Sequence, residues 1–264
     1  MKHSEGSSLS LFWKAFFVIA LAVFVFSAVQ LALIGKQYID ARHEYRDVAE
    51  SVEMNLQDDK EDETVDPLTR LIDFNALKGI NQEAVAWLWV PNVGIDYPVM
   101  HAADNDKYLH TTINGTYLSA GSIFEDYRNA ADFSDESIYI FGHHMKDGSM
   151  FSHLMDYQDE SVWKRDPYIY LYLPGKTRVY EIFSAHGTDA ESDDYSFGFV
   201  SSEGYSDWLN RVKNKSIYDT GVLVSPEDDV LTLSTCSSYW QQNSERFVIH
   251  AKCIKEIPAE QTHE

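Results

Sequence analysis

The first clear pattern along the chain is an apolar run near its start. Residues 15–35 contain 21 positions without a charge, and Phe, Val, Ile and Leu fall on every face of a helix drawn through them. At about 1.5 Å per residue, such a helix crosses the roughly 30 Å hydrocarbon core of a bilayer. The run is longer than the apolar region of a typical signal peptide and lacks a small-x-small cleavage site at its end. This pattern favours an uncleaved transmembrane anchor over the alternative, a cleavable signal peptide.

The next apolar positions repeat at three- and four-residue steps, which predicts that an amphipathic helix continues beyond the anchor. An acidic run at residues 58–63 interrupts it, and we interpret residues 36–66 as a helical stalk and linker. A metal site in this run is disfavoured because adjacent like charges repel. Pro67 then opens a second predicted helix, residues 67–81, with Asp66 as its cap. The stripe of the first helix consists of Tyr38, Ala41, Tyr45, Val48 and Val52.

From residue 84 the pattern changes to short runs rich in β-branched and aromatic residues, separated by turn residues. About eight such strands with few helices predict a mixed or antiparallel closed barrel. One late helix is predicted at residues 202–214, with Ser202 as its cap and one apolar face formed by Tyr205, Trp208, Leu209 and Val212. The predicted strands are residues 84–90, 95–100, 116–124, 137–142, 169–174, 178–187, 230–236 and 246–254.

Charge narrows the possible partners. The formal net charge is -21, with 21 Lys and Arg against 42 Asp and Glu, so we expect no nucleic-acid partner. The first 35 residues carry +1, residues 36–66 carry -7 and the remainder carries -15. Basic residues flank the apolar run on both sides, so the positive-inside rule does not fix its orientation.

The strongest candidate chemistry lies near the end of the chain. In residues 230–236, Val-Leu-Thr-Leu-Ser-Thr-Cys, strand alternation places Thr232, Ser234 and Cys236 on the more polar face. A nine-residue connection leads to the next strand, which begins at Arg246. If these strands pair antiparallel, Cys236 and Arg246 are neighbours, and the guanidinium can favour a thiolate or hold an oxyanion. The alternative is that Cys236 is a small buried hydrophobe and Arg246 a surface charge.

The second cysteine, Cys253, shares its strand face with Phe247, Ile249 and Ala251, so we expect it to pack in the core without a catalytic role. A disulfide between Cys236 and Cys253 is the alternative, and it would consume the proposed nucleophile. With only 2 cysteines, at most one disulfide can form and a four-cysteine zinc site is excluded.

A cysteine nucleophile needs a group that moves protons. His143 follows an apolar strand and Gly142, at the kind of strand-to-loop junction where catalytic side chains are often held. His144 is expected to point the opposite way. A zinc site is disfavoured because His101, His110, His153 and His186 show no HExxH or His-x-His spacing. No metal or cofactor is expected.

These residues resemble the sortases, the cysteine transpeptidases of Gram-positive bacteria. The resemblance rests on residues 232–236, Thr-Leu-Ser-Thr-Cys, followed by Arg246, and on residues 139–145, Tyr-Ile-Phe-Gly-His-His-Met. It extends from about residue 67 to the C-terminus. Five further segments occur in the order typical of class B: residues 87–91, 95–99, 105–109, 120–124 and 150–154.

The resemblance implies an eight-stranded sortase barrel with N-terminal helices and a helix between strands 6 and 7, preceded by one transmembrane helix. It also implies an orientation. Residues 1–14 would be cytoplasmic, residues 15–35 a single-pass anchor in the cell membrane, residues 36–66 an acidic stalk, and residues 67–264 an extracellular catalytic domain.

For the reaction, the resemblance implies cleavage of a C-terminal sorting signal on a secreted protein, and transfer of the acyl group to an amine of peptidoglycan or of a pilin lysine. Cys236 would attack the carbonyl of the signal's Thr to form a thioacyl-enzyme. His143 would move the protons and Arg246 would stabilise the oxyanion. By position, Asn105, Leu109 and Ser234 would bind the substrate.

Two positions depart from the family pattern. Ser238 stands where some class B members have an acidic residue, so no third catalytic acid is assigned. Phe141 stands where Tyr is common, which removes a hydroxyl contact. The alternatives that these residue types leave open are a hydrolytic cysteine protease, a zinc hydrolase and a non-enzymatic acidic surface protein.

Overall fold

The computed structural model describes residues 5–53, 66–236 and 244–259, without the side chains of residues 5–11 and 236. The acidic run at residues 58–63 and Ser238 lie outside the described residues. The chain divides into two compact units, residues 1–42 and 43–264. Each unit is described here by itself.

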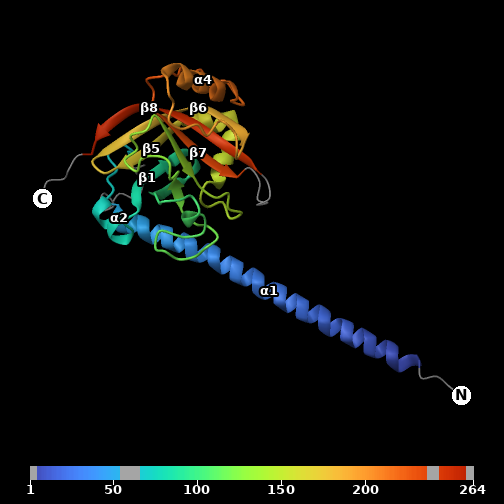
Figure 1. The fold of residues 1–264 in the computed structure, drawn as a ribbon. Coiled ribbons are helices and arrows are strands. Elements are labelled where there is room, and N and C mark those ends of the chain that lie inside the picture. Colours follow the sequence, from blue (N-terminus) through green and yellow to red (C-terminus); the bar gives the residue numbers. More distant parts are fainter. Residues whose placement is uncertain (1–4, 54–65, 237–243, 260–264) are drawn as a thin grey trace. The chain divides into compact units, whose positions relative to one another are not determined.

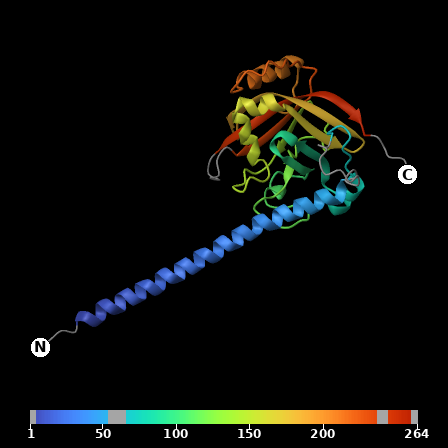
Figure 2. The same cartoon turned by 180° about the vertical axis from the view of Figure 1, so that it is seen from behind.

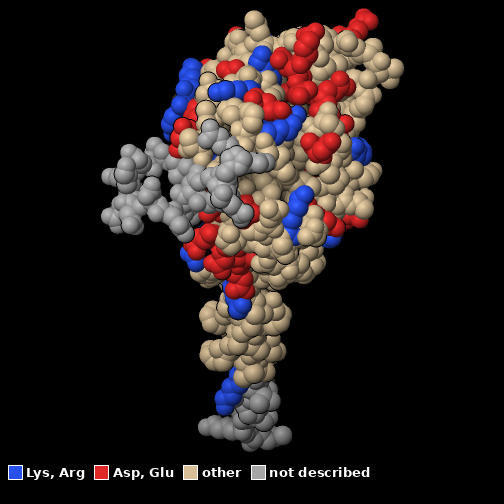
Figure 3. Space-filling view, turned by 90° about the vertical axis from the view of Figure 1, so that its left-hand side faces the viewer, with Lys and Arg blue, Asp and Glu red and all other residues tan. Residues whose placement is uncertain are grey.

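The first unit is helical. Helix α1, Glu5–Val52, begins in it and ends in the second unit. Its section Phe12–Val52 contains an 18-residue window with a mean hydropathy of 2.7, none of which is buried, so by length and composition it can cross a membrane. Residues 15–35 include no charged residue, in agreement with the long uncharged stretch of helix surface in Figure 3. The helix expected at residues 15–35 is therefore present.

The second unit begins with the last turns of α1, whose apolar stripe is buried at Tyr45, Val48 and Val52. The prediction that the next helix begins at Pro67 is wrong. Helix α2 covers only Phe74–Ile80, because the side chain of Asp73, rather than Asp66, accepts hydrogen bonds from the first free amides of the helix.

Eight strands form a closed barrel in the order β1-β2-β3-β4-β7-β8-β6-β5 (Figures 1 and 2), which confirms the predicted fold class. Two neighbouring pairs, β2 with β3 and β4 with β7, are parallel, and the other six pairs are antiparallel. The strands are β1 Ala84–Val90, β2 Ile95–Met100, β3 Ile123–Glu125, β4 Ser137–Phe141, β5 Tyr168–Leu173, β6 Lys176–Asp189, β7 Val230–Cys236 and β8 Glu245–Pro258.

Strand β3 is shorter than the sequence predicts. Pairing begins at Ile123 instead of Thr116, because a turn ends at Gly121, whose φ of 56° lies in the left-handed region. Short helices fill other connections: the 3₁₀ helices η1 Pro91–Val93, η2 Lys107–Leu109 and η3 Ser152–Gln158, and α3 Glu160–Arg165.

Helix α4, Ser202–Asn214, lies between β6 and β7 in the chain, as expected, although its cap is Ser201 instead of Ser202. Its predicted apolar face, Tyr205, Trp208, Leu209 and Val212, is buried. This face packs on side chains of β4, β6 and β7, including Tyr139, Phe183 and Val230. The strands that carry the candidate chemistry are thus held from outside by α4 (Figure 1).

Candidate functional site

Strand directions bring three candidate residues to one edge of the barrel. Strands β4 and β7 run parallel, with Phe141 opposite Ser234, so their carboxyl ends lie together. Strand β8 is antiparallel to β7, and the register places Arg246 opposite Cys236. His143 follows β4 by two residues and therefore lies at the same edge. The backbone thus gathers His143, Cys236 and Arg246 from three adjacent strands.

The residue between β4 and His143 is a glycine, and the packing around it leaves little room for a side chain. A Cβ atom on Gly142 would lie 2.4 Å from Ile123 Cδ1 and 2.7 Å from Phe151 Cγ, far inside normal contact. Without a side chain, its amide donates to Ser234 O at 3.2 Å and its carbonyl accepts from Thr235 Oγ1 at 2.9 Å. These two bonds continue the β4–β7 pairing as far as His143 and fix the position of the His143 backbone.

The imidazole of His143 is held by a backbone carbonyl. Its Nε2 lies 2.7 Å from Leu109 O, and since a carbonyl only accepts, Nε2 carries the hydrogen. Burial lowers the pKa of His143, the Leu109 hydrogen bond raises it in part, and the nearby His110 and Arg246 lower it further. The neutral form is therefore favoured, with Nδ1 left as the basic nitrogen.

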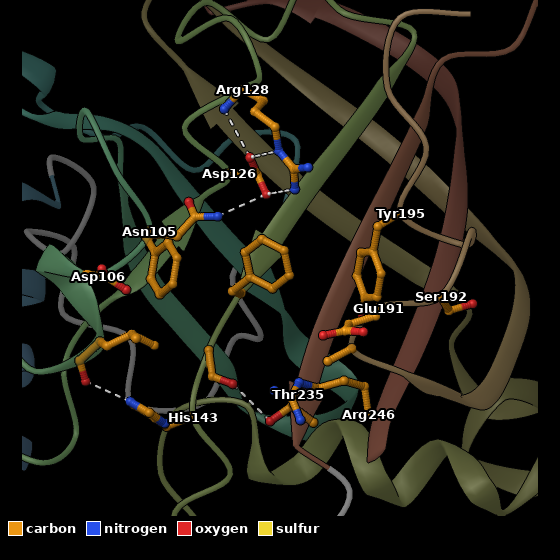
Figure 4. Close-up of a pocket in the computed structure, with 15 residues that line it drawn as sticks. Asn105, Asp106, Asp126, Arg128, His143, Glu191, Ser192, Tyr195, Thr235 and Arg246 are labelled. Atoms are coloured by element: carbon orange, nitrogen blue, oxygen red, sulfur yellow. Dashed lines mark hydrogen bonds and ion pairs between the residues drawn. The ribbon is translucent and has the colours of Figure 1, made fainter. Parts of the chain in front are cut away.

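A pocket of about 410 Å³ opens beside this edge (Figure 4). Of the residues proposed from sequence, Asn105, Leu109, His143 and Arg246 line it. Ser234 does not line the pocket: it is 1% exposed, and its Oγ lies 2.7 Å from the Tyr195 hydroxyl. The next residue, Thr235, lines the pocket instead.

Part of the pocket wall was not anticipated from sequence. The Arg128 side chain donates two hydrogen bonds to the buried Asp126, at 2.8 and 2.7 Å, and the Arg128 backbone amide donates a third at 3.0 Å. Asn105 Nδ2 donates a fourth, also at 3.0 Å (Figure 4). Burial raises the pKa of Asp126, but the bonds from Arg128 and Asn105 outweigh it and hold that pKa below its usual range. The Arg128 guanidinium also lies 3.8 Å from the centre of the Phe197 ring. No motif marks these residues, because the fold brings them together from separate segments.

The second cysteine is less enclosed than expected. Cys253 is half-buried instead of packed in the core, and burial raises the pKa of its thiol. It is a free thiol. Cys253 lies seven residues beyond Arg246 on β8, and Arg246 is the residue opposite Cys236. The backbone of Cys253 is therefore about 23 Å along the strand from that position. A disulfide between the two cysteines is therefore excluded, since it needs Cα atoms within about 7 Å.

Of the histidines considered as zinc ligands, two lie against single carboxylates and one stacks on another imidazole. His101 Nδ1 lies 3.0 Å from Glu125 Oε2, and His153 Nδ1 lies 2.9 Å from Asp156 Oδ2. The His110 ring stacks on His143, with centroids 5.8 Å apart and planes at 16°. In the part of the chain that the structure describes, no three His, Cys, Asp or Glu side chains form a group that could hold a metal ion.

Comparison with known proteins gives a consistent result. A family model described as a sortase domain matches residues 88–254. Sortase B of Listeria monocytogenes serovar 1/2a is 33% identical over 248 residues, covering 91% of this chain and 96% of its own. Sortase B of Staphylococcus aureus is 29% identical over 239 residues, covering 90% and 93%.

Solved structures agree with the sequence relatives. The crystal structure of sortase B from B. anthracis in complex with AAEK1 has a TM-score of 0.71 and 32% identity, covering 83% of this chain and 99% of that chain. The S. aureus sortase B-substrate complex has a TM-score of 0.72 and 27% identity, with the same coverage of 83% and 99%.

Proposed function

The chain belongs to the sortase family of cysteine transpeptidases, and from this premise we propose that it cuts a C-terminal sorting signal on a secreted protein and joins the new carboxyl to an amine of peptidoglycan or of a pilin lysine. One observation carries the proposal. The parallel β4–β7 pair and the antiparallel β7–β8 pair bring His143, Cys236 and Arg246 to one edge, beside a pocket of about 410 Å³.

In the first half-reaction the Cys236 sulfur attacks the carbonyl carbon of the signal's Thr. A C–S bond forms and the carbonyl becomes an oxyanion, which the Arg246 guanidinium stabilises. His143 takes the thiol proton at Nδ1, the nitrogen that the Leu109 hydrogen bond leaves basic, and gives it to the departing amine as the C–N bond breaks. A thioacyl-enzyme remains.

In the second half-reaction an incoming amine attacks the thioacyl carbon. His143 accepts a proton from that amine, the C–S bond breaks as the amide product forms, and His143 returns the proton to the Cys236 sulfur to regenerate the thiol. Water in place of the amine would give simple hydrolysis. The enzyme is therefore a transpeptidase with a peptidase half-reaction, and the amine decides which product forms.

The pocket is the place for the sorting signal. Asn105 and Leu109 line it, and the Asp126–Arg128 pair holds the Asn105 amide in place through the bond at 3.0 Å. Ser234, expected to contact the substrate directly, is hydrogen-bonded to Tyr195, which does line the pocket. Ser234 therefore orients Tyr195, and the Tyr195 ring is the surface that meets the signal.

The apolar helix serves as the membrane anchor. Its length and composition suit a single crossing, and the substrates of this reaction are secreted proteins. Residues 15–35 would hold the chain in the cell membrane, with the second unit outside the cell. Release of the chain from membranes by alkaline carbonate, which spares integral proteins, would contradict this assignment.

The experiment uses the full chain in detergent micelles and a library of C-terminal signal peptides. Intact mass spectrometry is expected to find a thioacyl adduct on Cys236, which Cys236→Ala abolishes and the matched control Cys253→Ala retains. Adding a glycine peptide should divert the product from acid to amide. Failure of every peptide to modify Cys236 would overturn the mechanism, and acid as the sole product at high amine concentration would identify a hydrolytic cysteine protease instead.

A further inference from the structure

Tyr45, in the last turns of α1, has contacts that its position in a helix does not require. Its side chain is buried, and its hydroxyl donates to Gly121 O at 2.5 Å and lies 3.0 Å from Ser122 Oγ. Its ring meets the Tyr97 ring edge to face, with centroids 5.3 Å apart. Burial raises the pKa of Tyr45, so its hydroxyl remains a hydrogen-bond donor at any working pH.

The first set of contacts leads to the acceptor of the His143 hydrogen bond. A Cβ atom on Gly121 would lie 2.5 Å from Leu109 O, so the Gly121 backbone packs directly against that carbonyl. The Ser122 amide donates to Tyr108 O at 2.9 Å in the same segment. By holding Gly121 and Ser122, Tyr45 fixes the carbonyl that lies 2.7 Å from His143 Nε2.

The second set of contacts leads to the segment that follows His143. The Tyr97 hydroxyl accepts from the Met150 amide at 3.1 Å. Met150 has a φ of 57°, a left-handed conformation that is costly for a side chain of this size and that the surroundings must hold. The next amide, that of Phe151, donates to His143 O at 3.0 Å. Tyr45 is therefore linked to the segment that carries the Leu109 carbonyl and, through Tyr97, to the segment that follows His143.

We propose that Tyr45 is a positioning residue for His143, and that residues 43–52 of α1 are in this way part of the transpeptidase site. The proposal rests on the acid-base role of His143 given above. Tyr45 touches no reacting atom in this scheme. It acts by holding the Leu109 carbonyl, which sets the plane of the imidazole and reserves Nδ1 for proton transfer.

The test uses the full chain in micelles with three variants. Tyr45→Phe removes the hydroxyl and keeps the ring contact, and Tyr45→Ala removes both. Ser122→Ala leaves α1 unaltered and removes the Ser122 hydroxyl, which contacts Tyr45 and donates to Thr111 O at 2.9 Å. The matched control is Arg46→Ala, an exposed neighbour on the same helix. Turnover of a signal peptide, its KM, the melting temperature and the NMR titration of His143 are measured for each.

For Tyr45→Phe we expect kcat to fall about tenfold, with KM changed less than about twofold. Because the Leu109 hydrogen bond raises the pKa of His143, weakening it should move that titration to lower pH. Tyr45→Ala should lose more and Ser122→Ala less, and Arg46→Ala should match the parent chain. A purely structural role would lower the melting temperature and leave the His143 titration in place.

An unchanged His143 titration and unchanged kcat in both Tyr45→Phe and Ser122→Ala would overturn the proposal. If Tyr45→Phe does not fold, Ser122→Ala decides by the same two readings. Failure of the parent chain to form a thioacyl adduct on Cys236 would overturn the proposed function instead. In that event the NMR titration still reads whether Tyr45 holds His143, so the two failures are distinguishable.

Discussion

The glycine that precedes His143 offers a sharp test of how the site is built. In Gly142→Ala the new methyl carbon would lie 2.4 Å from Ile123 Cδ1, whereas ordinary contact begins at 3.4 Å, so about 1 Å of displacement must be found. Ile123 and Phe151, the opposing side chains, are both fully buried and cannot move into solvent. We therefore expect part of the displacement to fall on the backbone that carries His143.

The magnitude follows from that displacement. Overpacking of this size costs about 1–3 kcal/mol of stability, which for a unit of this size lowers the melting temperature by about 2–12 °C. A shift of about 1 Å at a catalytic group costs about a hundredfold in turnover. We therefore expect a variant that is folded at room temperature but nearly inactive.

The assay pairs circular dichroism melting with turnover of a signal peptide. The matched control is Gly79→Ala in helix α2, where an added Cβ meets nothing within 4 Å. That control should keep full activity and gain about 0.5–1 kcal/mol of stability, because alanine favours a helix. Wild-type turnover in Gly142→Ala would refute the argument that the packing at Gly142 places His143.

Two further predictions concern groups around the site. His110→Ala removes the ring that stacks on His143 at 5.8 Å and should lower kcat about threefold to tenfold. His110→Phe keeps a flat ring and should retain most of the parent kcat. An equal loss of kcat in both variants would contradict a stacking role. Glu125 is fully buried beside His101, and burial raises its pKa to about 7. Because its pKa is raised above the unfolded value of 4.5, the folded state binds more protons between these limits, and stability should fall as pH rises from about 4.5 to about 7. The pKa of His101 is raised from 6.5, mainly by its hydrogen bond with Glu125, so its own contribution to stability is lost as pH rises above about 6.5. Melting curves of Glu125→Gln should show a weaker pH dependence in this interval, and an unchanged dependence would exclude the pair as its source.

Local patterns predicted much of this fold. Alternation and turn residues set β1 and β2 at their observed bounds, and the short connection after Cys236 was enough to predict that Arg246 lies opposite it. Where two local signals compete, the sequence misleads. Asp66 and Asp73 both suit a helix start, and only tertiary structure decides that Asp73 caps the helix while Asp66 accepts from Leu68 in a turn.

The rest depends on contacts between distant segments. The pairing of β4 with β7 is parallel and joins residues that no short connection links, so position alone could not place His143 beside Cys236. The surroundings of the Asp126–Arg128 pair also depend on distant segments. Asn105 hydrogen-bonds to Asp126, and the Phe197 ring lies against Arg128. The surroundings of Ser234, which the resemblance places against the substrate, also depend on a distant segment, because its hydroxyl lies 2.7 Å from the hydroxyl of Tyr195.

The parallel pair also sets when the enzyme can become active. The bond from Thr235 to Gly142 joins positions 93 residues apart, so it forms only after most of the chain has been made and the barrel closes. Contacts of such long sequence separation form late, because the entropy of closing the loop must be overcome first. Until then Cys236 is an ordinary thiol with no imidazole beside it. In the proposed mechanism a chain still being synthesised therefore cannot react through Cys236, and completion of the fold is the activating step.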